Sequence, residues 1–172
     1  MKNLKYIKIS QSEMTEERFK QVMQVENSTG SGYSEDEMRY LWIDGNINDN
    51  FVCMDNNDIV AHITFNPTSK RRNGSIYMLN LTVLPEYRRQ GIAQNLILEA
   101  CNYYHKIGQT IPMSTSVDKI NQPAINLYKK CGFEIKDPIC EIDYDDEQFI
   151  LEAPITTIIH TIENDKNNQK QL

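Results

Sequence analysis

The stretch Asn80–Gln94, NLTVLPEYRRQGIAQ, holds the residues best suited to bind an anion. It opens as an apolar, β-branched strand end, passes through Pro85, and carries two arginines and Gly91 into a helix-like run. The first turn of a helix presents free N–H groups, and the helix dipole adds partial positive charge there. Gly91 has no Cβ, so the backbone can approach a ligand closely. An anion site is therefore expected at this turn.

A second segment, Asn121–Phe133 (NQPAINLYKKCGF), holds a candidate proton donor. Pro123 in its first turn and Gly132 just past its end predict a helix over this run. Asn121 and Tyr128 are seven residues apart, so two helical turns bring them to the same face. A tyrosine hydroxyl, with an ordinary pKa of about 10, is protonated at neutral pH and can donate.

Strand and helix patterns alternate along the chain. Apolar and β-branched runs predict strands over residues 4–9, 51–54, 59–65, 75–84, 111–117, 133–142 and 148–162. Amphipathic runs predict helices over residues 15–26, 91–107 and 121–131, and another that is capped at Ser34. This order predicts an α/β fold (a mixed, α+β-like sheet) with helices on both faces. Residues 1–162 are expected to form one domain and residues 163–172 a loose polar tail.

The composition is that of a globular, mildly acidic protein. The 172 residues carry a formal net charge of −6, which disfavours nucleic acid and anionic membranes as partners because both need a basic face. No apolar run approaches the roughly 18 residues of a membrane span. The N-terminus is unlike a signal peptide, so a cytoplasmic protein is expected. The four cysteines and three histidines lack zinc-ligand spacing, so no metal is expected, and the cysteines are expected to be buried or half-buried free thiols.

The run Arg88–Ala93, RRQGIA, resembles the acetyl-CoA signature (Q/R)-x-x-G-x-(G/A) of the GNAT superfamily of N-acetyltransferases. It follows a strand with the matching context LTVLPEY. The segment Asn121–Phe133 is similar to the family's following helix, with the spacing N-x-x-A-x-x-x-Y-x-x-x-G-F. The resemblance is strong from Tyr77 to Phe133 and rests on element order elsewhere. It implies a GNAT-like fold and a small acetyl-CoA-dependent N-acyltransferase.

The resemblance also implies how acetyl-CoA binds. Backbone amides of the loop and first helical turn would hold the pyrophosphate, and the arginines would add charge-assisted contacts. The strand before the loop would part from its parallel neighbour, so that freed backbone groups pair with the pantetheine arm and polarise the thioester carbonyl. The implied cofactor-binding residues are Leu81, Thr82, Val83, Arg88, Arg89, Gln90, Gly91, Ile92, Ala93, Gln94, Asn121, Ala124 and Tyr128.

Tyr128 stands where the resemblance places a general acid. Attack of an amine on the thioester releases a thiolate, whose thiol has a pKa of about 8.5, and a tyrosine can reprotonate it. Many family members carry a glutamate base on the strand that holds Asn80, but Tyr77–Asn80 contains no carboxylate. The base is left open between a water ordered by Asn80 or Tyr77, the Glu26 carboxylate, and His62.

Family architecture implies that the loop Asn27–Tyr33 and the acidic turn Asp143–Glu147 face the acceptor. The favoured acceptor is a small cationic primary amine that attacks directly in a ternary complex. A protein N-terminus or lysine is an alternative acceptor, and a non-catalytic acyl-CoA-binding sensor or interaction module is the alternative function. A monomer or homodimer is expected. The candidate substrate contacts are Tyr33, Tyr77, Ser116 and Asp145.

Overall fold

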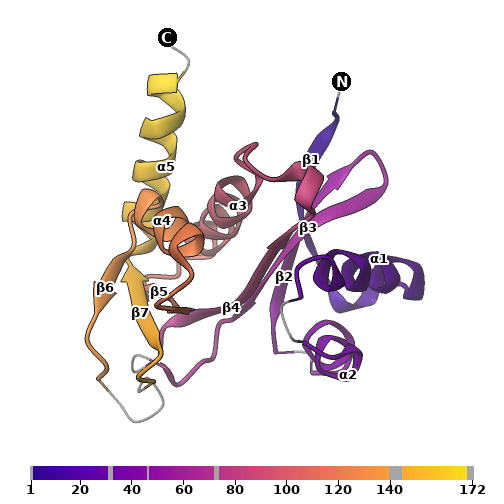
Figure 1. Cartoon of the computed structure of the whole chain (residues 1–172), viewed down its shortest axis with the longest axis horizontal. Helices are drawn as coiled ribbons and strands as arrows, with labels where there is room; N and C mark the ends of the chain where they lie inside the picture. Colours follow the sequence, from indigo (N-terminus) through magenta and orange to yellow (C-terminus); the bar gives the residue numbers. More distant parts are fainter. Residues whose placement is uncertain (1, 31–32, 46, 72–73, 140–144, 170–172) are drawn as a thin grey trace. The chain divides into compact units, whose positions relative to one another are not determined.

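A computed structural model describes residues 2–30, 33–45, 47–71, 74–139 and 145–169 (Figure 1). Seven strands form one mixed sheet in the order β1-β2-β3-β4-β5-β7-β6. β4 pairs with β5 in parallel, whereas the pairs β1–β2, β2–β3, β5–β7 and β6–β7 are antiparallel. The expected α/β class with a mixed sheet is therefore confirmed. The strands are β1 (Leu4–Ile9), β2 (Asp49–Asp55), β3 (Asp58–Asn66), β4 (Ile76–Val83), β5 (Met113–Asp118), β6 (Glu134–Lys136) and β7 (Gln148–Ala153).

The chain divides into two compact units. Unit 1 comprises Met1–Asn66 and Leu79–Ala100, and unit 2 comprises Pro67–Met78 and Cys101–Leu172. Strand β4 and helix α3 (Ile92–Lys106) each contribute residues to both units. The 3₁₀ turns η1 (Gln11–Glu13) and η4 (Pro85–Tyr87) belong to unit 1.

In unit 1, helices α1 (Glu16–Asn27) and α2 (Glu35–Arg39) pack on one face of the sheet. Both helices begin at side-chain caps. Thr15 accepts a hydrogen bond from the Arg18 N–H, and Ser34 forms the capping box that its sequence predicts. The core between these helices and the strands contains Ile9, Phe19, Val22, Val25, Met38, Trp42, Val52 and Ile59. On the opposite face, Asn95 of α3 donates a hydrogen bond to the Tyr6 hydroxyl at 3.2 Å, so helices cover both faces.

A π-helical turn, η2 (Tyr40–Asp44), continues α2 and was not expected from the sequence. The wider turn is closed by a hydrogen bond from the Gly45 N–H to the Tyr40 carbonyl oxygen at 2.8 Å. It also leaves the Leu41 carbonyl to outside donors, and the side-chain amides of Asn48 and Asn50 both donate to it. The turn places Trp42 in the core, where its ring meets the His62 ring edge-on at 5.4 Å between centroids.

In unit 2, β7 lies between β5 and β6, and helices α4 (Gln122–Lys130) and α5 (Ile155–Gln169) belong to the same unit. The parallel pairing of β4 with β5 joins Ile76 to Met113 and Tyr77 to Ser114. The Thr115 hydroxyl donates to the Met78 carbonyl oxygen directly after these pairs. The predicted parting of the strands concerns Leu81 and Val83, which belong to unit 1, and it stays a prediction.

The C-terminal region differs from expectation. Residues 148–162 were expected to form one strand, but β7 ends at Ala153, and α5 begins after Pro154 and continues to Gln169. Proline cannot donate to a ladder and favours the first turn of a helix. The buried residues Ile155, Ile158 and Ile162 follow helical spacing. Residues 163–169, expected to be a loose tail, are the last turns of this helix.

Strand β6 also covers only the start of the strand expected over residues 133–142. Residues 140–144 of that run lie outside the described part of the chain. Cys53, Cys101 and Cys131 are buried, as expected, and none of these three forms a disulfide; Cys140 is outside the described residues. Among the helices that the structure describes, none has the length and apolar character needed to cross a bilayer.

Candidate functional site

The predicted anion loop takes the form that its sequence indicates. Strand β4 ends at Val83, the 3₁₀ turn η4 follows, and α3 begins at Ile92. The Asn95 N–H donates to the Gly91 carbonyl oxygen at 3.0 Å, so the N–H groups of Ile92, Ala93 and Gln94 precede this first bond of the helix. These N–H groups and the helix dipole can hold a phosphate-bearing cofactor.

Two residues of this loop have positive φ angles. Gly91 has φ +76°, in the left-handed region that glycine occupies without a Cβ penalty, and Arg89 has φ +61°. The Arg88 side chain donates from Nε to the Val83 carbonyl oxygen at 3.1 Å, which ties the loop to the end of β4. Gln90 donates to the Glu86 carbonyl oxygen and accepts from Lys2. The loop is therefore held by its own side chains.

A buried polar cluster lies elsewhere in unit 1, between α1, β3 and β4. The Glu26 side chain is 1% exposed, and its Oε2 accepts a hydrogen bond from the Thr82 hydroxyl at 3.0 Å. His62, which is fully buried, places Nε2 2.9 Å from the same oxygen. This is an ion-pair distance, although the ring N–H is not aligned for a hydrogen bond. Glu26, one of the open alternatives for the base, therefore lies beside another of them.

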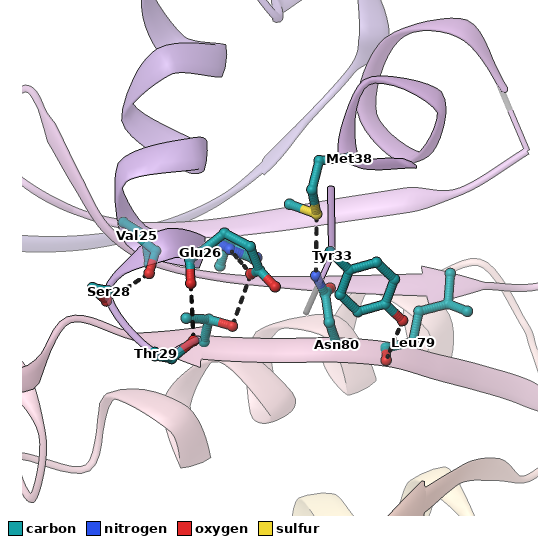
Figure 2. Close-up of polar contacts among 10 residues, drawn as sticks. Val25, Glu26, Ser28, Thr29, Tyr33, Met38, Leu79 and Asn80 are labelled. Atoms are coloured by element: carbon teal, nitrogen blue, oxygen red, sulfur yellow. Dashed lines mark hydrogen bonds and ion pairs between the residues drawn. The ribbon is translucent and has the colours of Figure 1, made fainter. Parts of the chain in front are cut away.

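The loop after α1 is pinned by its own hydroxyl groups. Figure 2 shows Ser28 and Thr29 donating to the carbonyl oxygens of Val25 and Glu26, at 2.6 and 2.9 Å. These bonds close the last turn of α1, which ends at Asn27, and hold its backbone in place. The side chain of Glu26 is consequently held at the last turn of the helix.

Asn80 and Tyr33 are anchored near the same part of β4 (Figure 2). The Asn80 side-chain amide donates to the Met38 sulfur at 3.6 Å, whereas its Oδ1 is buried with no hydrogen-bond partner among the described residues. The Tyr33 hydroxyl donates to the Leu79 carbonyl oxygen at 3.4 Å. Asn80 was expected to order a water, and its Oδ1 is the atom that has no hydrogen-bond partner among the described residues.

Helix α2 and the start of η2 line an open pocket of about 360 Å³ in unit 1. Its walls are mainly apolar surface of tyrosine and leucine side chains, with two carboxylates among them. The Glu37 carboxylate is engaged by the Ser34 N–H and hydroxyl, at 2.7 and 2.8 Å, which lower its pKa. The lining residues are Tyr33, Asp36, Glu37, Tyr40 and Leu41.

In unit 2, Tyr128 lies on α4 and is almost completely buried. Burial raises the pKa of its hydroxyl, and a hydrogen bond with the Thr115 side chain opposes that shift. Its ring meets the Phe133 ring at 5.7 Å between centroids. The hydroxyl is therefore kept in its protonated form, the form that a general acid needs at neutral pH.

The other candidates in unit 2 also have defined partners. The Tyr77 and Ser116 hydroxyls are hydrogen-bonded to each other at 2.6 Å, and the Arg71 guanidinium lies over the Tyr77 ring. Asn121 caps α4 by accepting from the Ala124 N–H at 3.2 Å, and Asp145 accepts from the Glu147 N–H. Asp143, in the expected acidic turn, lies outside the described residues.

The structure thus places the candidates in two groups, each described within its own unit. In the described part of the chain, no cluster of three or more His, Cys, Asp or Glu side chains could hold a metal ion. Unit 1 contains Glu26, Tyr33, Asn80, Leu81, Thr82, Val83, Arg88, Arg89, Gln90, Gly91, Ile92, Ala93 and Gln94. Unit 2 contains Tyr77, Ser116, Asn121, Ala124, Tyr128 and Asp145.

Residues 19–133 match the Acetyltransferase (GNAT) family, so the match includes both the anion loop and the helix with Tyr128. The chain belongs to this family. The resemblance found in the sequence is therefore confirmed, and so, at the level of the family, is the expectation of an acyltransferase that uses acetyl-CoA. The roles of individual residues stay predictions.

Similar proteins agree with this assignment. The chain is 31% identical over 88 residues to the L-amino acid N-acetyltransferase AaaT of Escherichia coli (strain K12). That match covers 49% of this chain and 52% of the relative, so it spans about half of the relative's length.

Solved structures share the fold across most of the chain. The ribosomal-protein-S18-alanine N-acetyltransferase of Escherichia coli has a TM-score of 0.69 at 20% identity, with 88% of this chain and 94% of that one covered. Arabidopsis thaliana NAA60 in complex with acetyl-CoA has a TM-score of 0.69 at 18% identity, with 90% and 99% covered. At these identities the likeness shows the GNAT fold.

The grouping of Glu26, His62 and Thr82 was not predicted. The sequence indicates Glu26 and His62 separately as possible bases, and Thr82 as a cofactor contact. They come from three separate segments, and no local spacing links them. The alternation of inward and outward side chains along β3 and β4 could have indicated the cluster. A histidine or threonine at an inward position of an apolar strand needs a buried polar partner.

Proposed function

We propose that this protein is an acetyl-CoA-dependent N-acetyltransferase whose acceptor is a primary amine of a small, cationic molecule. The observation that carries the proposal is the family match over residues 19–133, which includes the anion loop and the helix of Tyr128. The positive φ of Gly91 and the amides that follow it support pyrophosphate binding at the loop.

The proposed reaction is direct attack of the amine on the thioester in a ternary complex. The amine nitrogen bonds to the carbonyl carbon, and the oxyanion that forms is stabilised by backbone N–H groups near Leu81 and Val83. The C–S bond then breaks, and Tyr128 donates a proton to the thiolate. The proton that the new amide nitrogen loses restores Tyr128. Burial raises the pKa of Tyr128, so the phenol is neutral and carries the proton that the thiolate accepts.

The α2 pocket supports a small acceptor that combines a positive charge with apolar groups. Tyr33, Tyr40 and Leu41 supply apolar surface, and Asp36 and Glu37 supply negative charge. The relative AaaT is an L-amino acid N-acetyltransferase by name, which makes amino acids and their amine derivatives the first acceptors to test.

A protein N-terminus is the second candidate acceptor. It is favoured by the structural neighbour that is named as a ribosomal-protein-S18-alanine N-acetyltransferase. A peptide acceptor and a small amine present the same ammonium group, so only turnover on both kinds of acceptor distinguishes them.

The test is CoA release from acetyl-CoA with a panel of L-amino acids, diamines and short peptides, with the acetylated product identified by mass spectrometry. Tyr128→Phe should lower kcat by about 10²-fold or more. Tyr103→Phe is the matched control, because Tyr103 lies on α3 outside the proposed site, and it should retain the wild-type rate. CoA binding with no turnover across the panel would instead favour the non-catalytic sensor.

A further inference from the structure

Glu26 is a buried carboxylate of unit 1 that has no role in the reaction steps proposed for Tyr128 and the backbone amides. It comes from the last turn of α1, and it meets Thr82 of β4 at 3.0 Å and His62 of β3 at 2.9 Å. A buried carboxylate loses its hydration, so it needs a charged or hydrogen-bonding partner. Such an arrangement is costly to maintain and is common where protons are transferred.

The groups that face Glu26 define what can share its proton. His62 is the titratable group from β3, and Thr82 from β4 is an uncharged donor. Met38 of α2 and Trp42 of η2, which pack in the same core, are uncharged. Among the described residues, Glu26 and His62 are the carboxylate and the histidine of the buried set. Among the described residues of this cluster, these two side chains are therefore the ones that can take up a proton.

Polar atoms without a protein partner lie on the same face of the sheet. His62 and Thr64 alternate along β3, and Asn50 is paired with Thr64 in the β2–β3 register. Asn80 and Thr82 alternate in the same way along β4. Six buried atoms of Trp42, Asn50, His62, Thr64 and Asn80 have no hydrogen-bond partner among the described residues, and buried polar atoms normally bind a water or a ligand group. These atoms are Trp42 Nε1, Asn50 Oδ1, His62 Nδ1, His62 Nε2, Thr64 Oγ1 and Asn80 Oδ1.

We propose that Glu26 is the proton acceptor for the amine in the acetyl transfer, and that His62 is a positioning residue that holds its carboxylate and shares the proton. The inference rests on the proposed N-acetyltransferase activity. An acceptor ammonium ion loses one proton through ordered water to the Glu26 carboxylate, which leaves the nitrogen lone pair free to attack. After CoA leaves as the thiol, the Glu26–His62 pair releases that proton to solvent.

The decisive variant is Glu26→Gln, which keeps the size of the side chain and removes its ability to accept a proton. It should lower kcat/KM about 10²-fold or more near neutral pH and leave CoA affinity unchanged. The defect should shrink as the pH approaches about 10, where an alkylamine loses its proton without help. Glu17→Gln, on the exposed side of the same helix, is the control and should retain the wild-type pH profile.

Acceptors of different basicity separate a proton-transfer role from a structural one. A weakly basic amine needs no base, so Glu26→Gln should acetylate it almost as fast as the wild type does, whereas a structural defect would slow all acceptors equally. Glu26→Asp should restore part of the rate. If Glu26→Gln does not fold, Thr82→Val tests the same point, since loss of its hydrogen bond should move the acid limb of the wild-type profile to higher pH.

The outcomes are distinct. Equal loss of rate for all acceptors and at every pH would overturn the role of Glu26, as would an unchanged rate. Failure of the wild type to acetylate any amine would instead overturn the proposed function.

Discussion

Replacing Gly91 by alanine should affect both the free energy of unfolding, through backbone strain, and the affinity for CoA, through the approach of the anion. At φ +76°, a residue with a Cβ costs about 1 kcal/mol relative to glycine. A Cβ built at Gly91 would meet only the Asn95 side-chain amide, at 3.9 Å, so no steric clash adds to this cost. We therefore expect the free energy of unfolding to fall by about 1 kcal/mol and Tm to fall by about 2–4 °C.

Gly108→Ala is a matched control for this strain. Gly108 has φ +78°, and a Cβ there would meet nothing within 4 Å, so both variants should lose the same stability in urea denaturation. CoA binding should distinguish them, because a methyl group at Gly91 stands where the anion approaches the helix N–H groups. By isothermal titration calorimetry, Gly91→Ala should lose at least about tenfold in affinity, or ~1.4 kcal/mol, and Gly108→Ala should lose none.

Two results would refute the reasoning about the anion loop. Wild-type CoA affinity in Gly91→Ala would show that the pyrophosphate does not lie at these amides. An equal loss of affinity in Gly108→Ala would show that backbone strain alone, and not the approach of the ligand, explains the effect.

Further predictions concern packing and alkaline stability. Gly132→Ala should lower the free energy of unfolding by about 2–3 kcal/mol in urea denaturation, which is more than Gly108→Ala should lose. The Cβ at position 132 would lie 2.9 Å from Thr161 Oγ1, at a φ of +92°. Thr161→Ala should restore part of the lost stability, and equal losses in Gly132→Ala and Gly108→Ala would contradict this packing. Burial raises the pKa of Tyr6 to about 12 and that of Cys53 to about 11. In the unfolded chain these groups lose their protons at the ordinary pKa values, 10.0 for tyrosine and 9.0 for cysteine. The folded state retains the protons to higher pH, so Tm should fall as the pH rises through this range. Tyr6→Phe should flatten that fall in thermal scans between about pH 8 and 11, and an unchanged slope would contradict it.

Local signals predicted most of the fold. Ser34 with Glu37, Thr15 and Asn121 are helix caps whose function depends only on neighbours three residues away, so their sequence is sufficient. Helix α5 was missed because isoleucine and threonine favour strands by propensity. Its isoleucines fit a helix only once Pro154 separates them from β7.

The π-turn η2 illustrates what no local pattern shows. Its geometry depends on the Gly45 bond to Tyr40 and on Asn48 and Asn50, which reach back to the Leu41 carbonyl from beyond the turn. The anion loop, in contrast, was predictable because its strand, glycine and helix start are contiguous. The Glu26 cluster was not, because its three side chains meet only when α1, β3 and β4 are packed.

The neutral residue at position 80 is consistent with the charge that this face of β4 already receives. Asn80 and Thr82 are two residues apart on one strand, so both side chains point to the same, buried side. Thr82 there contacts the Glu26 carboxylate, and His62 is the one histidine beside it. A second carboxylate at position 80 would put two buried like charges on that side, and one of them would have to remain protonated. An amide at position 80 avoids this conflict. It supplies a buried oxygen without adding charge, and Glu26 reaches the strand from α1 as the single carboxylate of the cluster.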